Sequence, residues 1–379
     1  MPRGWFTAIR VAIVVAGGAV ILSLVQWQTT LVTAVGQAGL DGQIAQVERE
    51  QVVVSMEYLD SGYWRVETAD GQRGVVDDAD IRRSLPALLI EADLLWLLVG
   101  LALVGCVYPL QATRWWLLMR CRKIDSTWLR TLRLVLVGAF CNFFLPGTEG
   151  GDVVKAWGAA KGTDRRVEAV MSVVFDRITG LAGLVLVAAI AGIFLAESEQ
   201  ARNVGLWTGL GMVFVVIFGV AAFFIAERGW LRLPEVVRSF GGGLPGRAMD
   251  AARAYGRHPG AVVQATGVSM VVQVCLAAAA GCCAWAVGAE LDLVVVLTIM
   301  PILFIAAAVP LFWQGAGVME LVGIMLLASP EVATSSQVIA LLVLYRVLEF
   351  IWGLIGSLLM LGGGIQLHPS APAPPESGS

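Results

Sequence analysis

Two pairs of charged residues have the types and the spacing of a binding site. Arg177 follows Asp152 by 25 residues, and Arg346 follows Glu320 by 26. Both arginines fall inside long apolar runs, where a charge is costly unless it is paired or wetted, so each is a functional candidate. A guanidinium binds phosphate through two parallel hydrogen bonds and keeps its proton. We expect Arg177 and Arg346 to hold the phosphate of a ligand, while Asp152 and Glu320 neutralise the arginines or receive a cationic group.

The same residues have a structural interpretation that the sequence leaves open. An arginine and a carboxylate at membrane depth can tie two segments together without touching a ligand. Asp176 is adjacent to Arg177, and Glu349 follows Arg346 by three residues, so each arginine has a second carboxylate nearby. Asp176 is therefore included in the candidate site. Both interpretations are compatible with transport.

Each pair is attached to an interruption in an apolar run. Residues 143–152 contain a proline and three glycines, and residues 310–320 contain a proline and two glycines. Proline removes a backbone donor and glycine leaves helical dihedrals readily, so both helices should break. Such a break is tolerated at membrane depth only where it is buried in protein or lines a watery cavity. We predict two re-entrant hairpins, with Glu149 and the backbone amides of Gly150 and Gly151 adding to the first site.

The composition places the chain among polytopic helical membrane proteins. It is 58% hydrophobic and 15% charged, and several apolar runs approach or exceed the length that spans a bilayer. The two interruptions lie at matching places in two halves, which is the pattern of transporters built from inverted repeats. The expected fold is an all-α polytopic membrane protein, an inverted-repeat helical bundle with two re-entrant hairpins and a small extracytoplasmic β segment. The apolar segments expected to enter or cross the membrane are residues 93–112, 134–145, 169–196, 204–226, 261–287, 293–309 and 337–361.

Basic residues predict which loops face the cytoplasm. Lysine and arginine cluster in residues 114–133, 155–166 and 228–257, and such clusters are typical of cytoplasmic loops. A full crossing by the first interrupted segment would put the second cluster outside, whereas a re-entrant hairpin keeps it inside. We therefore expect all three loops in the cytoplasm, and no lysine or arginine at membrane depth other than Arg177 and Arg346.

Four regions follow from these patterns. Residues 1–27 are expected to be an N-terminal transmembrane anchor with a cytoplasmic N-terminus, because arginines precede the first apolar run; a cleaved signal peptide is the alternative. Residues 28–92 form the extracytoplasmic β segment, and residues 93–362 form the transmembrane domain. Residues 363–379, rich in proline, serine and alanine, form a disordered tail. The protein is expected in the cell membrane.

The β segment is predicted from short runs in which apolar and polar residues alternate. The expected strands are residues 51–58, 63–68 and 73–76. We expect Trp64 and Val66 to lie on opposite faces of the second strand. Because the segment is acidic, it is poorly suited to bind anionic lipid headgroups. We expect a structural role or the docking of an extracytoplasmic partner through residues 41–84.

Several motifs resemble those of one known family. The matching sequences are Asn142–Gly147, Gly150–Asp152, Ser172–Arg177, Gly315–Glu320 and Tyr345–Arg346. They are similar to the lysylphosphatidylglycerol synthase transmembrane family of flippase-like proteins, over roughly residues 93–362. The resemblance implies a helical membrane domain that moves an aminoacylated phospholipid between leaflets. It also brings Asn142, Gly317 and Tyr345 into the candidate site.

The chain departs from that family in three respects. In the family's namesakes a soluble synthase domain follows the membrane domain, whereas this chain ends shortly after its last apolar run. Lysyl-lipid synthesis is therefore not expected, and the cargo stays open. The outer β segment and the residues Thr148-Glu149 within the first interruption also differ from the family pattern.

The predicted function is movement of a lipid with a polar or charged headgroup, either a phospholipid or a lipid-linked headgroup, between the two leaflets. The expected ligand is a membrane lipid, and neither nucleic acid nor a metal or cofactor is expected. No catalytic residues are assigned, because nothing in the sequence resembles a nucleotide site, a metal triad or a nucleophile–base pair. Two alternatives stay open. One is an accessory subunit or scaffold for enzymes that modify lipids or glycans, and the other is a transferase that acts on a lipid-linked substrate.

Overall fold

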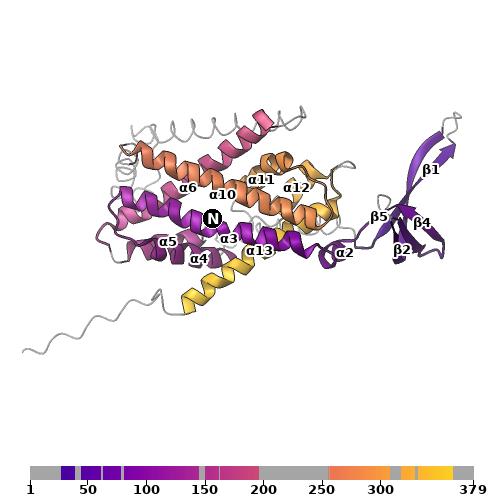
Figure 1. Cartoon of the computed structure of the whole chain (residues 1–379), viewed down its shortest axis with the longest axis horizontal. Helices are drawn as coiled ribbons and strands as arrows, with labels where there is room; N and C mark the ends of the chain where they lie inside the picture. Colours follow the sequence, from indigo (N-terminus) through magenta and orange to yellow (C-terminus); the bar gives the residue numbers. More distant parts are fainter. Residues whose placement is uncertain are drawn as a thin grey trace, which may run out of the picture. The chain divides into compact units, whose positions relative to one another are not determined.

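Four long apolar helices dominate the computed structural model of this chain (Figure 1). The residues that it describes are 27–38, 44–60, 63–77, 81–144, 150–161, 163–195, 255, 257–307, 317–328 and 332–361. The helices long and apolar enough to cross a membrane are α3 (Leu94–Cys121), α6 (Arg166–Ile190), α10 (Pro259–Ala286) and α13 (Ser335–Leu361). They confirm the prediction of an all-α polytopic membrane protein.

Two shorter helices, α4 (Trp128–Phe144) and α5 (Gly150–Ala160), form the first predicted hairpin. A side chain at Gly151 near the start of α5 would collide with the carbonyl of Gly138, which lies late in α4. At the other end, Arg130 Nη2 donates to the Gly158 carbonyl at 3.0 Å and to the Lys161 carbonyl at 2.5 Å. The start of each helix therefore lies against the end of the other, so the pair is antiparallel.

The second interruption also separates two helices, α11 (Leu293–Ala307) and α12 (Val318–Leu327). The two pack against each other, since a Cβ at Gly323 of α12 would lie 3.7 Å from Leu303 of α11. Between α6 and α10 the structure describes a π-helical turn, η2 (Ala191–Leu195). The order of long helix, helical hairpin and long helix thus occurs twice in the described chain: α3, α4–α5 and α6, then α10, α11–α12 and α13.

Several predictions fall outside the described residues. These are the anchor (residues 1–26), the break of the first hairpin with Glu149, the helix at 204–226 and nearly all of the loop at 228–257, the break of the second hairpin, and the tail. The boundaries of the four predicted regions stay predictions.

The β segment is larger than the sequence indicated. It is a five-stranded antiparallel sheet of order β4-β3-β2-β1-β5. Its strands are β1 (Thr30–Ala38), β2 (Ile44–Asp60), β3 (Tyr63–Thr68), β4 (Arg73–Asp77) and β5 (Ile81–Arg82). The first part of β2 pairs with β1 and the second part with β3, so β2 joins the two halves of the sheet (Figure 1). A short helix, α2 (Leu85–Ile90), follows β5.

The core of the sheet corrects one expectation. Leu31, Val66 and Ile81 are buried together, and Trp64 and Met56 pack against them. Trp64 and Val66 therefore share a face of β3. The prediction of opposite faces was wrong, because side chains two residues apart in a strand point to the same side.

The described helices divide between two compact units. One contains residues 108–182, 221–269 and 350–379 and includes the first hairpin; the other contains residues 1–107, 183–220 and 270–349 and includes the second. In the first unit, α4 also packs against the end of α13, where a Cβ at Gly353 would lie 3.3 Å from the Phe143 ring. Each candidate pair of charges lies within one unit.

Candidate functional site

The first site is built on a buried ion pair between α3 and α6. Arg114 Nε donates to Asp176 Oδ1 at 2.7 Å, and the two side chains are only 7% and 3% exposed. Arg114 Nη1 also donates to Ser269 Oγ of α10 at 3.1 Å. A Cβ at Gly180 would approach the Arg114 guanidinium to 3.0 Å, so the glycine leaves room for the arginine beside α6.

Lys155 of α5 lies between two carboxylates. Its Nζ is 3.9 Å from Asp176 Oδ2 and 3.5 Å from Asp152 Oδ1, and its side chain is 10% exposed. The Nζ also lies 5.8 Å from the centre of the Trp115 ring. Its aliphatic stem packs over Gly138 of α4, where a Cβ would come within 3.2 Å of Lys155 Cγ. A small residue in α4 therefore gives this lysine its place in the interior.

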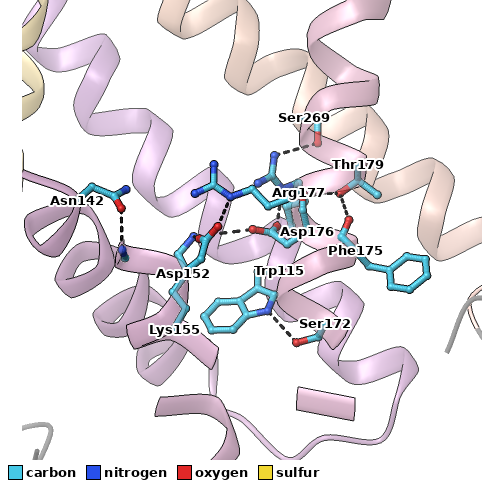
Figure 2. Close-up of polar contacts among 12 residues, drawn as sticks. Trp115, Asn142, Asp152, Lys155, Ser172, Phe175, Asp176, Arg177, Thr179 and Ser269 are labelled. Carbon is cyan, nitrogen blue, oxygen red and sulfur yellow. Dashed lines mark hydrogen bonds and ion pairs between the residues drawn. The ribbon is translucent and has the colours of Figure 1, made fainter. Parts of the chain in front are cut away.

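Arg177 completes the arrangement. Its Nε donates to Asp152 Oδ2, as Figure 2 shows. The Asp152 side chain is 14% exposed, whereas the Arg177 side chain is 50% exposed. Arg114, Asp176, Lys155, Asp152 and Arg177, in this order, form a chain of alternating charge that we call the first-half cluster. Among the residues that the structure describes, its three cations and two carboxylates leave one surplus positive charge, and its most exposed member is Arg177.

Neighbouring polar contacts hold the helices of this cluster in place. Trp115 Nε1 of α3 donates to Ser172 Oγ of α6 at 3.0 Å, one turn before Asp176 (Figure 2). Asp152 and Lys155 lie three residues apart on α5 and so project from the same face. Asp176 and Arg177 are adjacent on α6 and point in different directions, which lets Asp176 pair with Arg114 and Lys155 while Arg177 pairs with Asp152.

Besides Asp152, three predicted site residues lie in the described part of the first hairpin. Asn142 Oδ1 of α4 accepts the Gly151 amide at 2.7 Å, which satisfies one backbone donor at the start of α5 (Figure 2). Gly151 lies directly against α4, and Gly150 is the first residue of α5. Asn142 and Gly151 therefore make a contact that joins the two helices of the hairpin.

The second site, in the other unit, has a similar central pair. Arg346 Nη2 lies 3.1 Å from Glu320 Oε1, and the side chains are 19% and 10% exposed. Glu320 Oε2 also accepts the Gly317 amide at 2.6 Å and so caps α12. Gly317 has a φ of 91°, a conformation that favours glycine. The same carboxylate thus fixes the start of α12 and binds the arginine.

Tyr345 and Glu349 extend this second site along α13. The Tyr345 hydroxyl donates to Glu349 Oε1 at 3.2 Å. The centres of the Tyr345 ring and of the Phe304 ring in α11 are 5.7 Å apart. We call Glu320, Tyr345, Arg346 and Glu349 the second-half cluster. It has one cation and two carboxylates, so its charge balance is the opposite of that of the first-half cluster.

A comparison with known protein families shows to which family the chain belongs. The family model described as the lysylphosphatidylglycerol synthase TM region matches residues 79–356. The chain belongs to this family. The match includes both clusters and both hairpins, and it confirms the resemblance that the motifs indicated. No curated protein matches the chain in sequence. Membership in the lysylphosphatidylglycerol synthase transmembrane family identifies a multi-pass membrane protein linked to the modification or flipping of lipids.

The sequence analysis assigned two residues of the first-half cluster to the wrong part of the protein. Arg114 and Lys155 were assigned to cytoplasmic loops, but they are buried in α3 and α5. The prediction that only Arg177 and Arg346 lie among the apolar helices was therefore wrong. One signal could have found Lys155, since it lies one helical turn after Asp152. For Arg114, the apolar residues Trp115, Leu118 and Met119 indicate that α3 continues beyond its predicted end.

Proposed function

We propose that this member of the lysylphosphatidylglycerol synthase transmembrane family is a flippase that moves a phospholipid with a charged headgroup between leaflets. The proposal includes no chemical step and no metal or cofactor. Arg177 binds the headgroup phosphate, and Asp152 neutralises the arginine when no lipid is bound. The observation that carries this proposal is the surplus positive charge of the first-half cluster, whose most exposed member is Arg177.

The cost of these charges supports a function. Placing one arginine, lysine or aspartate at the centre of a membrane helix costs about 3 kcal/mol on insertion scales. Alternating pairing offsets much of this cost for Arg114, Asp176, Lys155 and Asp152. Among the described residues, the network has three cations and two carboxylates and so carries a net positive charge. An anionic group at Arg177 would balance the charges, and a guanidinium suits phosphate.

The second-half cluster enters the proposal as a separate binding element. Arg346 is the second phosphate ligand, and Glu320 is its partner in the absence of lipid. Since this cluster contains two carboxylates, it also suits a headgroup that carries an amine.

Orientation and partners belong to the same proposal. We propose that the protein lies in the cell membrane with a cytoplasmic N-terminus, and that the loops on either side of the first hairpin face the cytoplasm. The five-stranded sheet then lies outside, where residues 41–84 dock a partner.

A reconstitution experiment tests the proposal. The full chain is placed in liposomes that contain a trace of phosphatidylglycerol with a fluorescent group on one acyl chain, and dithionite then bleaches the probe in the outer leaflet. A flippase lets dithionite bleach nearly all of the fluorescence, whereas protein-free liposomes retain about half of it because a bilayer has two leaflets. Arg177→Ala should behave like the protein-free liposomes.

A matched variant controls for the loss of charge. Arg120 lies in the last turn of α3, is exposed, and its guanidinium lies 4.7 Å from the centre of the Trp116 ring. Arg120→Ala should therefore retain transfer. Absence of transfer by the wild-type protein, or equal transfer by Arg177→Ala and the wild type, would contradict the proposal and favour an accessory or scaffold function.

A further inference from the structure

The carboxylate of Asp152 faces two cations with its two oxygens. Oδ2 accepts a hydrogen bond from Arg177 Nε. Oδ1 is buried and accepts no hydrogen bond within the described part of the chain. Lys155 Nζ lies 3.5 Å from this oxygen. One side of the carboxylate is therefore bonded to the exposed arginine, while the other faces a buried lysine at a longer distance.

Lys155 is loosely held on both sides. Its distances of 3.5 Å to Asp152 and 3.9 Å to Asp176 both exceed the roughly 2.8 Å of a charge-assisted hydrogen bond. Asp176 does not depend on the lysine, because Arg114 already binds it at 2.7 Å. The Lys155 ammonium is thus close to Asp152 but lies at more than the distance of a charge-assisted hydrogen bond from both carboxylates.

We propose that Lys155 is a positioning residue that takes over Asp152 when Arg177 binds the headgroup. This inference rests on the proposed function of Arg177. A shift of about 0.7 Å would bring Lys155 Nζ to hydrogen-bonding distance from Asp152 Oδ1. Arg177 then leaves Oδ2 and turns its guanidinium to the phosphate. The result is three pairs: Arg114 with Asp176, Lys155 with Asp152, and Arg177 with the ligand.

The takeover solves a problem that a simple arginine–aspartate pair would have. If Arg177 left Asp152 without a substitute cation, a carboxylate that is 14% exposed would lose its partner, and the cost would oppose ligand binding. With Lys155 in place, Asp152 exchanges one cation for another. The place of Lys155 over Gly138 keeps the lysine within reach of Asp152 in both states.

A double-mutant cycle tests this inference. Purified full-length protein is titrated with dihexanoyl phosphatidylglycerol, and binding is measured by calorimetry for the wild type, Lys155→Met, Asp152→Asn and the double variant. Lys155→Met should weaken binding about tenfold in the wild-type background, because Asp152 then holds Arg177. In the Asp152→Asn background the same substitution should weaken binding by about threefold or less, because no carboxylate needs a partner.

Two further variants make the experiment decisive. Lys161→Met removes a charge just beyond the end of α5, where the lysine lies 5.1 Å from the Trp157 ring, and should leave binding within about twofold. Lys155→Arg keeps the cation and should restore most of the affinity. If Lys155→Met lowered the affinity equally in the two backgrounds, the lysine would act only through its electrostatic field and not through Asp152. The inference would then be overturned.

The failure of this inference differs from the failure of the proposed function. If Arg177→Ala binds the probe as well as the wild type, the proposed site itself is wrong. If Arg177→Ala loses binding but Lys155 and Asp152 show no coupling, only the takeover is wrong. If neither Lys155→Met nor Lys155→Gln yields folded protein by size-exclusion chromatography, the lysine is required for the structure and the takeover is rejected.

Discussion

Arg177 and Arg346 occupy the same position in their helices. Arg177 is the twelfth residue of α6, which begins at Arg166, and Arg346 is the twelfth residue of α13, which begins at Ser335. The two partner carboxylates also correspond, since Asp152 and Glu320 are each the third residue of the second helix of a hairpin. The arginine and its carboxylate therefore occupy equivalent helix positions in the two halves, as expected for an internal repeat.

The first prediction concerns the form of the charge at position 177. Arg177→Lys should keep only part of the lipid transfer, because an ammonium cannot bind phosphate in the two-pronged way of a guanidinium. Arg177→Ala should lose transfer while yield is retained, since Lys155 still lies near Asp152. Transfer and yield are measured together in the proteoliposome assay. Restored transfer in Arg177→Ala with Asp152→Ala would show that the arginine does not hold the cargo.

The second prediction separates the two tasks of Glu320. Glu320→Gln removes the ion pair with Arg346 but keeps an oxygen that can accept the Gly317 amide. Glu320→Ala removes both contacts. The alanine variant should therefore be less stable than the glutamine variant by about 1 kcal/mol, which is the usual contribution of a helix cap. Thermal unfolding in detergent measures the difference, and equal stability of the two variants would exclude a capping role.

The third prediction concerns the buried end of the first-half cluster. Asp176→Asn should lower the stability of the folded protein by about 3–5 kcal/mol, because it leaves Arg114 buried without a carboxylate. Much of this loss should be recovered when Arg114→Met is added, since the second change removes the unpaired charge. Protein yield and thermal unfolding of the single and double variants provide the test. A double variant as unstable as Asp176→Asn alone would argue against the pair.

The fourth prediction compares two glycines. Gly151→Ala should lower stability by about 1–3 kcal/mol, because the new methyl group would meet the Gly138 carbonyl and force α4 and α5 apart. Gly267→Ala in α10 is the control, as nothing lies within 4 Å of the position that its Cβ would take. This control should be neutral or stabilising by up to about 1 kcal/mol, since alanine favours helices. Unfolding midpoints of both variants check the comparison.

The fifth prediction concerns membrane orientation. In a background without native cysteines, Lys161→Cys and Asp125→Cys should react with an impermeant maleimide only after the cells are permeabilised. Glu91→Cys, between α2 and α3, should react in intact cells because the proposed orientation puts it outside. Labelling of Lys161→Cys in intact cells would contradict a re-entrant first hairpin.

The sequence predicted the long helices because these depend on local patterns. Apolar runs locate the helices. What it missed depends on contacts distant in sequence. Arg114 looks like an interfacial arginine because basic residues and tryptophans follow it, and only its contact with Asp176, 62 residues away, shows that it is buried.

The sheet was underestimated for a related reason. Residues 30–38 contain alanine, glycine and glutamine, which are weak strand signals, and they become β1 by pairing with β2. The extra length of β2 before residue 51 is also fixed by this pairing. Where a partner strand sets the boundaries of a strand, the alternation of apolar and polar residues in one segment cannot predict them.

The contact of Arg130 with the carbonyls of Gly158 and Lys161 limits how the first hairpin can move. It joins the beginning of α4 to the end of α5, and the Asn142–Gly151 hydrogen bond joins the two helices near their other ends. A helix pair fastened at both ends does not readily splay or slide. In the proposed transport cycle the hairpin would therefore move as one rigid body.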